Sequence, residues 1–314
     1  MQIHQLTYFV AVARTRHFTR AAELTGVSQP TLSKQIRVLE NSLGTPLFAR
    51  DRGGIELTSA GEALLPHAQR ILIDVENAQR TVHEVASLRH GRVRLGATPS
   101  LCDGLLPEAL TRFHTLYPAI DLEVQEAGSQ VLARELAQGR LDVALLIAPQ
   151  HSTEPDIEIT PVLRERLVLA SPLTSEMPDR MDVSELRDLP LAIFREGYDL
   201  RDVVLRACAA AGFEPKLAVE GGEMSAVLSF VQAGLGHAVV PSMVLAARPQ
   251  LRATQLENPP LDRVIALAHR SSEALPLAAQ AFKAGLLEHL TKVGSRDLEL
   301  VPPQGSASGA NQRK

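Results

Sequence analysis

The chain has 314 residues, of which 45% are hydrophobic and 22% are charged, a composition that excludes a disordered, a collagen-like or a disulfide-stapled protein. Its length favours two domains over one. The formal net charge is -4, but seven basic and four acidic side chains give residues 1–60 a charge of +3, which leaves -7 for the rest. A basic first part suggests that it meets an anion, although a chance imbalance would look the same.

No export signal or membrane span is expected. The longest stretch without a charged side chain covers residues 224–247, but glycines and Pro241 interrupt it, so a helix, a turn and a buried strand are predicted there. Two cysteines, Cys102 and Cys208, are too few for a disulfide framework and suit a reducing compartment. We therefore expect a cytoplasmic protein that does not bind a membrane.

A short turn at Gly26 precedes a helix that is predicted over residues 29–40. Ser28 is placed to cap this helix, and apolar residues at i, i+4 and i+7 form its buried face. Its other face is polar and basic, which is the helix-turn-helix pattern, whose second helix enters the major groove of DNA. A plain three-helix bundle with a solvated charged face is the alternative.

The DNA contacts expected from this helix and its cap are Ser28, Gln29, Pro30, Thr31, Ser33, Lys34 and Arg37. Gln29, Ser33 and Lys34 can hydrogen-bond base edges, whereas Arg37 lies further along and reaches phosphate. A hairpin is predicted next, around Gly53-Gly54, with Arg50 and Arg52 on one side. These two arginines can lie against the DNA backbone or minor groove, or they can be solvated edge charges.

Four segments carry a resemblance to a known family: FTRAAEL at 18–24, VSQPTLS at 27–33, IRVLE at 36–40 and GTPLFAR at 44–50. They resemble the winged helix-turn-helix of LysR-type transcriptional regulators, and the resemblance extends more loosely over the whole chain. It implies a sequence-specific regulator of transcription and not an enzyme. The implied partners are double-stranded promoter DNA, RNA polymerase and further copies of the chain, as a homodimer or homotetramer.

Residues 59–89 are predicted to form one long linker helix. Its heptad seam consists of Leu64, Ala68, Ile71, Val75, Ala78, Val82 and Val85. Such a seam favours a coiled coil between two subunits, which would present two recognition helices about 34 Å apart on DNA. Pro66 predicts a kink or restart. The alternative is that the helix packs on its own chain.

Strands and helices alternate after Gly91, which predicts an α/β fold with ligands at the carboxyl ends of the strands. The family resemblance implies a two-lobed effector domain, like a periplasmic binding protein, that follows the all-α winged helix-turn-helix of residues 1–58. The expected limits are 90–301 for this domain, with lobe I at 92–161 and 268–300 and lobe II at 162–267. The tail at 302–314 is expected to be disordered.

The residues expected to bind an effector between the lobes are Thr98, Ser100, Ser129, Phe194, Arg195, Met224 and His237. Hydroxyl groups at helix starts favour an anionic ligand such as a carboxylate, with which Arg195 would pair. Ordinary helix capping explains the hydroxyls equally well. The expected mechanism is closure of the lobes on a small metabolite, which repositions the DNA-binding domains.

Other chemistries receive less support. The sequence GLGH at 234–237 lacks the third glycine of a nucleotide loop, and the histidines and cysteines have no metal-ligand spacing, so no cofactor or metal is expected. Cys102, at a helix start beside the cleft, could be the sensor of a thiol-based redox regulator or simply a small buried residue. An enzyme or solute-binding protein would make the N-terminal domain incidental.

Overall fold

The computed structural model describes residues 1–51, 54–84, 91–148, 156–271, 274–291 and 298–301. The chain divides into two compact units, residues 1–83 and 84–314. The predicted site residues Arg52 and Val85 and the predicted tail at 302–314 lie outside the described residues. In the described part of the chain, no helix is long and apolar enough to cross a membrane.

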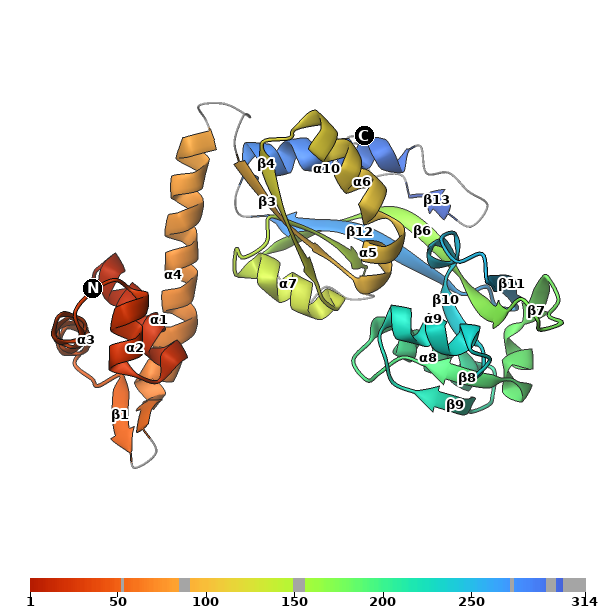
Figure 1. Cartoon of the computed structure of the whole chain (residues 1–314), viewed down its shortest axis with the longest axis horizontal. Coiled ribbons are helices and arrows are strands. Elements are labelled where there is room, and N and C mark those ends of the chain that lie inside the picture. The colour runs from red at the N-terminus through yellow and green to blue at the C-terminus, as the bar shows by residue number, and fades with distance from the viewer. Residues whose placement is uncertain (52–53, 85–90, 149–155, 272–273, 292–297, 302–314) are drawn as a thin grey trace, which may run out of the picture. The chain divides into compact units, whose positions relative to one another are not determined.

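The first unit is a winged helix-turn-helix followed by a long helix, which agrees with the predicted fold (Figure 1). Its elements are α1 (Ile3–Thr15), α2 (Phe18–Leu24), α3 (Gln29–Leu43), β1 (Phe48–Asp51), β2 (Gly54–Leu57) and α4 (Ser59–Glu84). Its core is made by the apolar faces of the helices together with Leu47 of the wing and Ala68 of α4. The helix α4 continues through Pro66 without the restart that the proline suggests.

The second unit contains a mixed nine-stranded sheet and a separate two-stranded sheet. Its first elements are β3 (Gly91–Ala97), α5 (Pro99–Gly104), α6 (Leu106–Leu116), β4 (Ile120–Glu126), α7 (Ser129–Ala137), β5 (Val143–Ile147), β6 (Ile157–Pro172), β7 (Arg180–Asp182), the 3-10 helix η1 (Val183–Asp188) and β8 (Pro190–Ile193). The remaining elements are α8 (Asp199–Ala210), β9 (Lys216–Glu220), α9 (Met224–Gln232), β10 (Ala238–Pro241), η2 (Ser242–Leu245), β11 (Leu251–Glu257), β12 (Asp262–Arg270), α10 (Leu277–Leu290) and β13 (Leu298–Leu300).

Helices cover both faces of the lobe I sheet, whose strand order is β4-β3-β5-β12-β6. The strand β5 is buried on both sides: Val143 and Leu145 belong to the core beneath α6 and α10, whereas Ala144 and Leu146 belong to the core beneath α7 (Figure 1). A strand buried on both faces needs a continuous apolar run, which is what residues 143–147 provide.

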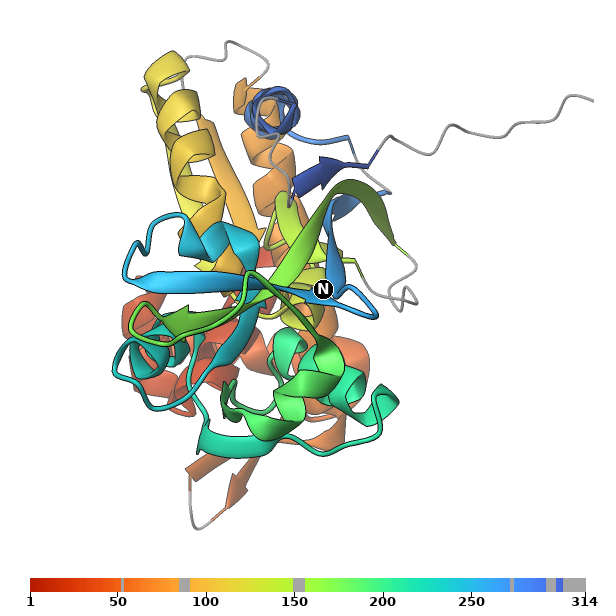
Figure 2. The ribbon, with the colours of Figure 1, turned by 90° about the vertical axis from the view of Figure 1, so that its right-hand side faces the viewer.

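The long strand β6 joins the two lobes. Its residues 157–166 pair with β12 in lobe I, and its residues 167–172 pair with β10 and β11 in lobe II. Figure 2 shows α6 (yellow) and α10 (blue) at one end of this unit and η1 and β8 (green) at the other. The lobe limits proposed from the sequence, at 161/162 and 267/268, therefore fall inside strands, and all of β12 pairs within the lobe I sheet.

Candidate functional site

The exposed face of α3 is built as a surface for contact with another molecule. Ser28 caps the helix by accepting a hydrogen bond from the Thr31 backbone N–H, and Gly26 in the preceding turn has φ +69°. Positive φ costs glycine little, so the turn can be tight. The predicted contacts Gln29, Pro30, Thr31, Lys34 and Arg37 are exposed, while Ser28 is exposed at the cap and Ser33 is half-buried.

Two cations on this face are available for an anionic partner. Lys34 and Arg37 form no ion pair with any residue that the structure describes. Near the start of the helix, the side-chain amide of Gln29 donates a hydrogen bond of 2.9 Å to the Ser33 hydroxyl oxygen. A row of amide, hydroxyl and ammonium groups along one helix face matches the donors and acceptors of base edges in the major groove.

The wing is attached to α3 by one carboxylate. Glu40 Oε1 accepts hydrogen bonds from the backbone N–H groups of Leu47 (2.9 Å) and Phe48 (3.3 Å). In the hairpin that follows, Arg50 lies opposite Ile55. The hairpin predicted from Gly53-Gly54 therefore forms, and Arg50 belongs to its first strand.

The heptad seam of α4 is divided between two environments. Ala68 is fully buried in the core of its own unit, and Leu64 and Ile71 are partly buried against the same core. The expectation that Ala68 faces a second subunit is therefore wrong, because a heptad pattern does not specify which chain covers it. Further along α4, Ala78 and Val82 are exposed and Val75 is half-buried.

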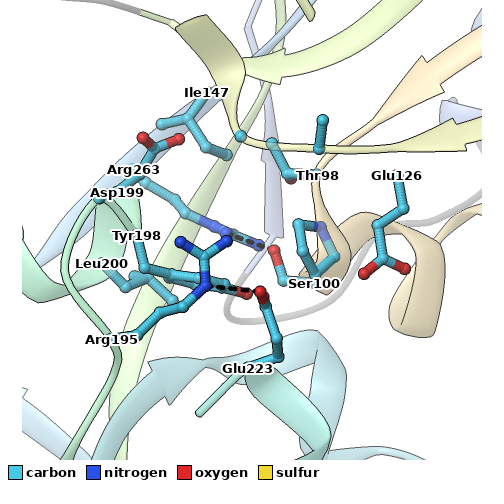
Figure 3. Close-up of a pocket in the computed structure, with 14 residues that line it drawn as sticks. Thr98, Ser100, Glu126, Ile147, Arg195, Tyr198, Asp199, Leu200, Glu223 and Arg263 are labelled. Atoms are coloured by element: carbon cyan, nitrogen blue, oxygen red, sulfur yellow. Dashed lines mark hydrogen bonds and ion pairs between the residues drawn. The ribbon is translucent and has the colours of Figure 1, made fainter. Parts of the chain in front are cut away.

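A pocket of about 480 Å³, partly open to solvent, lies where the two lobes of the second unit face each other (Figure 3). It is lined by Thr98, Pro99, Ser100, Glu126, Ala127, Gly128, Ile147, Arg195, Gly197, Tyr198, Asp199, Leu200, Glu223 and Arg263. Of the seven residues predicted to bind an effector, Thr98, Ser100 and Arg195 line it. The strand ends of lobe I and the loops of lobe II thus meet at one place, as open α/β sheets do at their ligand sites.

The back of the pocket is formed by a buried ion pair. Arg263 donates from Nε to Glu165 Oε2 (2.8 Å) and from Nη1 to the Ser100 hydroxyl oxygen (2.7 Å). Glu165 also accepts a hydrogen bond from the Met243 backbone N–H. Because a guanidinium can only donate, the hydroxyl hydrogen of Ser100 remains available to a ligand.

Two further hydroxyl groups are buried in the pocket wall without a partner in the described part of the chain: Thr98 Oγ1 and Tyr198 Oη. Burial raises the pKa of the Tyr198 phenol, so it is a neutral donor. An unsatisfied buried hydroxyl costs free energy, and a bound ligand that accepts its hydrogen bond removes that cost.

The remaining predicted residues lie around the pocket and not in its lining. Phe194 stacks on the Tyr198 ring at a centroid distance of 4.5 Å, and Met224 is buried in the core. Ser129 donates to Asp199 Oδ2 (2.6 Å), which joins α7 of lobe I to α8 of lobe II. His237 shares a hydrogen bond of 2.8 Å with Ser171, and burial lowers its pKa.

Cys102 is poorly suited to be a reactive thiol. Burial, followed by the neighbouring carboxylates of Glu126 and Asp103, raises its pKa to about 12. The helix that contains Cys102 has only six residues and acidic groups surround the sulfur, so this site favours the alternative that Cys102 is a small packed residue. A protonated thiol is a weak nucleophile, so the redox-sensor hypothesis loses its chemical basis at this position.

Sequence reasoning missed Glu126, Tyr198, Asp199, Glu223 and Arg263. Glu126 ends the strand β4, which the alternating pattern predicts over residues 120–126, so it could have been found by the strand-end criterion that selected Thr98. Glu223 directly precedes Met224, which lies at the junction before the helix predicted over residues 225–232. Arg263 lies in β12, a strand that was not predicted, so no local signal marked it.

Two family models match the chain: "LysR substrate binding domain" over residues 86–291 and "Bacterial regulatory helix-turn-helix protein, lysR family" over residues 3–62. The chain belongs to the LysR family of transcriptional regulators. This LysR-type protein is therefore a DNA-binding regulator with an effector-binding domain, which confirms the fold and the function predicted from the sequence.

Full-length relatives agree with this assignment. The HTH-type transcriptional regulator IlvR of Caulobacter vibrioides is 32% identical over 304 residues, covering 94% of this chain and 99% of IlvR. The crystal structure of full-length CbnR complexed with its target DNA has a TM-score of 0.69 and 27% identity, covering 93% of this chain and 99% of CbnR. The hydrogen peroxide-inducible genes activator of Dickeya chrysanthemi is 30% identical and covers 92% of this chain and 96% of its own length.

Proposed function

We propose that this LysR-type regulator changes its binding to promoter DNA when a small molecule occupies the pocket between its lobes. The observation that carries the proposal is that one pocket takes hydrogen-bond donors from both lobes: Thr98 and Ser100 from lobe I, and Tyr198 from lobe II. A ligand that accepts from both sides binds the closed arrangement better than an open one. Differential affinity of this kind is what allows a ligand to shift a conformational equilibrium.

On the DNA side, the exposed amide and hydroxyl groups of α3 are proposed to read bases, and Lys34 extends that row. Arg37 is proposed to contact phosphate, and Arg50 and Arg52 of the wing to contact the backbone or minor groove. These roles are supported by the exposure of the α3 face and by its unpaired cations within the described residues. Further support comes from CbnR, a protein of similar fold that has been crystallised in complex with its target DNA.

We further propose that the chain acts as a homodimer or homotetramer. In the second half of the α4 seam Ala78 and Val82 are exposed and Val75 is half-buried, which supports pairing through that part of the helix. Two paired subunits would place their recognition helices about 34 Å apart, one turn of DNA. We also propose that the protein contacts RNA polymerase, which works at the same promoters. Its location is proposed to be cytoplasmic, where the promoter DNA is.

The first experiment is recovery of sheared genomic DNA of the source organism by the purified full-length protein at two salt concentrations. Retention of a few discrete promoter fragments that persist at the higher salt is expected, because base contacts survive when phosphate contacts weaken. Footprints on those fragments are then compared with and without any pocket ligand. Retention of all fragments at low salt only would contradict sequence-specific binding, and identical footprints for every bound ligand would contradict control by the pocket.

A further inference from the structure

The pocket presents charges of both signs, but its positive charges are already paired. Arg263 is neutralised by Glu165, and their side chains are 3% and 0% exposed. Arg195 pairs with Glu223, with Nε and Oε1 2.6 Å apart. The arginine that the sequence suggested for a ligand carboxylate is therefore engaged by an acidic side chain of the pocket.

Two carboxylates of the lining, those of Asp199 and Glu126, form no ion pair with any residue of the described ranges, and Asp199 accepts a hydrogen bond from the Ser129 hydroxyl (2.6 Å). Glu126 is exposed and interacts with the Cys102 thiol, which also donates to the Ala97 backbone oxygen (3.9 Å). Two more carboxylates act on Glu126, those of Asp103 and Glu223. A ligand that carried only negative charge would be repelled on this side of the pocket, whereas a cationic group would be attracted.

The hydroxyl groups of the lining favour a negatively charged part of the ligand. Thr98, Ser100 and Tyr198 are 4%, 1% and 7% exposed, and each has a hydroxyl hydrogen without an acceptor among the described residues. Three buried donors in the lining of one pocket can serve the two oxygens of a carboxylate, which only accepts hydrogen bonds. Figure 3 shows Ser100 between the Glu126 carboxylate and the Arg195 guanidinium.

The register of two strands sets the backbone distance between the hydroxyl groups and the Glu126 carboxylate. The parallel strands β3 and β4 pair with Ala97 opposite Glu126, and Thr98 follows Ala97 directly. The hydroxyl side and the acidic side are thus about one inter-strand spacing apart, roughly 4.8 Å at the backbone. A ligand that meets both must carry its anionic and cationic groups close together on a short skeleton.

We infer that the pocket binds a free α-amino acid as its zwitterion, with the carboxylate held by Thr98, Ser100 and Tyr198 and the ammonium group held by Glu126. This inference rests on the proposed function of the pocket and names the class of its ligand. Glu223 Oε2, which is buried without a partner in the described part of the chain, offers the ammonium group a second acceptor. Ile147 and Leu200 provide apolar contacts for the amino-acid side chain. The inference keeps the carboxylate expected from the sequence and adds an ammonium group, because that expectation did not include Glu126.

The test uses the full-length protein and titration calorimetry with each of the twenty common L-amino acids. For every binder, the matched 2-hydroxy acid, which lacks the ammonium group, and the matched amine, which lacks the carboxylate, are titrated as well. We expect at least one amino acid to bind, and both analogues to bind at least tenfold more weakly.

Variants test which residues bind the ammonium group and which bind the carboxylate. Glu126→Gln keeps the shape but removes the charge, so amino-acid affinity should fall about tenfold while affinity for the 2-hydroxy acid stays equal or rises. Thr98→Val should weaken both ligands. Glu123→Gln is the control, because Glu123 lies on the same strand but its side chain is 62% exposed and faces Arg92, away from the pocket lining.

The inference is overturned if no amino acid binds, if a 2-hydroxy acid binds as tightly as its amino acid, or if Glu126→Gln leaves amino-acid affinity unchanged. Failure of the proposed function has a different signature. In that case a ligand binds the pocket with the predicted dependence on Glu126, but footprints on the recovered promoter fragments are the same with and without it.

Discussion

Arg263 of β12 and Glu165 of β6 form an ion pair across neighbouring strands of the effector-binding domain, with Arg263 Nε and Glu165 Oε2 2.8 Å apart. Because β6 continues from this point into lobe II, the pair lies beside the junction of the lobes. It also presents the Ser100 hydroxyl to the pocket. Because the side chains of Arg263 and Glu165 are 3% and 0% exposed, the pair should affect the stability of the domain as well as ligand binding.

Removing one partner of this pair should be costly. Arg263→Met removes the guanidinium that pairs with the buried Glu165 carboxylate, so the effector-binding domain should lose about 3–5 kcal/mol of unfolding free energy. Arg164→Met breaks the longer Arg164–Asp262 contact, whose side chains are 48% and 27% exposed, and should cost less than about 1 kcal/mol. Urea denaturation measures both, and hydrogen exchange of β6 and β12 assigns the transition. Equal losses in the two variants would refute the buried pair.

Gly61 lies in the first turn of α4 and packs against the backbone of Leu47, just before the wing. A Cβ at this position would lie 2.2 Å from the Leu47 carbonyl oxygen, so Gly61→Ala should destabilise the winged domain by about 1–3 kcal/mol through displacement of the backbone. Gly285→Ala is the contrast, because a Cβ there meets nothing within 4 Å in α10 and helix propensity should add about 0.5–1 kcal/mol. Melting curves for the two variants should therefore shift in opposite directions.

Lys34 and Arg37 should differ in what they contribute to DNA binding. Lys34→Ala should cost about 1–3 kcal/mol on the specific site and relax the base preference, whereas Arg37→Ala should weaken specific and random DNA alike and lower the salt slope by about one. Binding isotherms on both DNAs at several salt concentrations separate these effects. If the two variants lose the same affinity on both DNAs, the division of roles is wrong.

Binding of an amino acid should depend on pH through Glu126. Burial, and then the carboxylates of Asp103 and Glu223, raise the pKa of Glu126, while the hydrogen bond from Cys102 lowers it in part. Only the ionised carboxylate attracts an ammonium group, so affinity should be complete above the raised pKa and should fall as the pH drops through it. Calorimetry from neutral to acidic pH measures the decline, and Glu126→Gln should abolish it. A flat profile in the unmodified protein would contradict the role of Glu126.

The sequence predicted the winged helix-turn-helix well because its signals are local: a capped helix, a glycine turn and apolar spacing all lie within a few residues. The strand β6 was not predicted, and three consecutive charged residues, Arg164, Glu165 and Arg166, interrupt its apolar pattern. In the fold, Glu165 is neutralised by a residue 98 positions later in the chain, which no short window of the sequence contains. Strand ends were predictable, but the charge balance of the pocket was not.

The heptad seam shows a second limit of the sequence. Leu64, Ala68 and Ile71 repeat at coiled-coil spacing, yet their own winged domain covers them. Periodicity reports that one face of a helix is buried but does not identify the covering surface. The same ambiguity applies to hydroxyl groups at helix starts: Ser28 caps its helix, whereas Thr98 makes no side-chain cap and lines the pocket.

The attachment of the wing through Glu40 has a consequence for how such a regulator can diverge. Glu40 is near the end of α3, about three helical turns from Gln29, so the residues proposed to face bases are not the ones that hold the hairpin in place. Substitutions at the start of α3 can therefore alter which operator is recognised without loosening the wing. A duplicated copy of this chain could acquire new target promoters by changes at a few exposed positions, while its folding and its effector chemistry stay as they are.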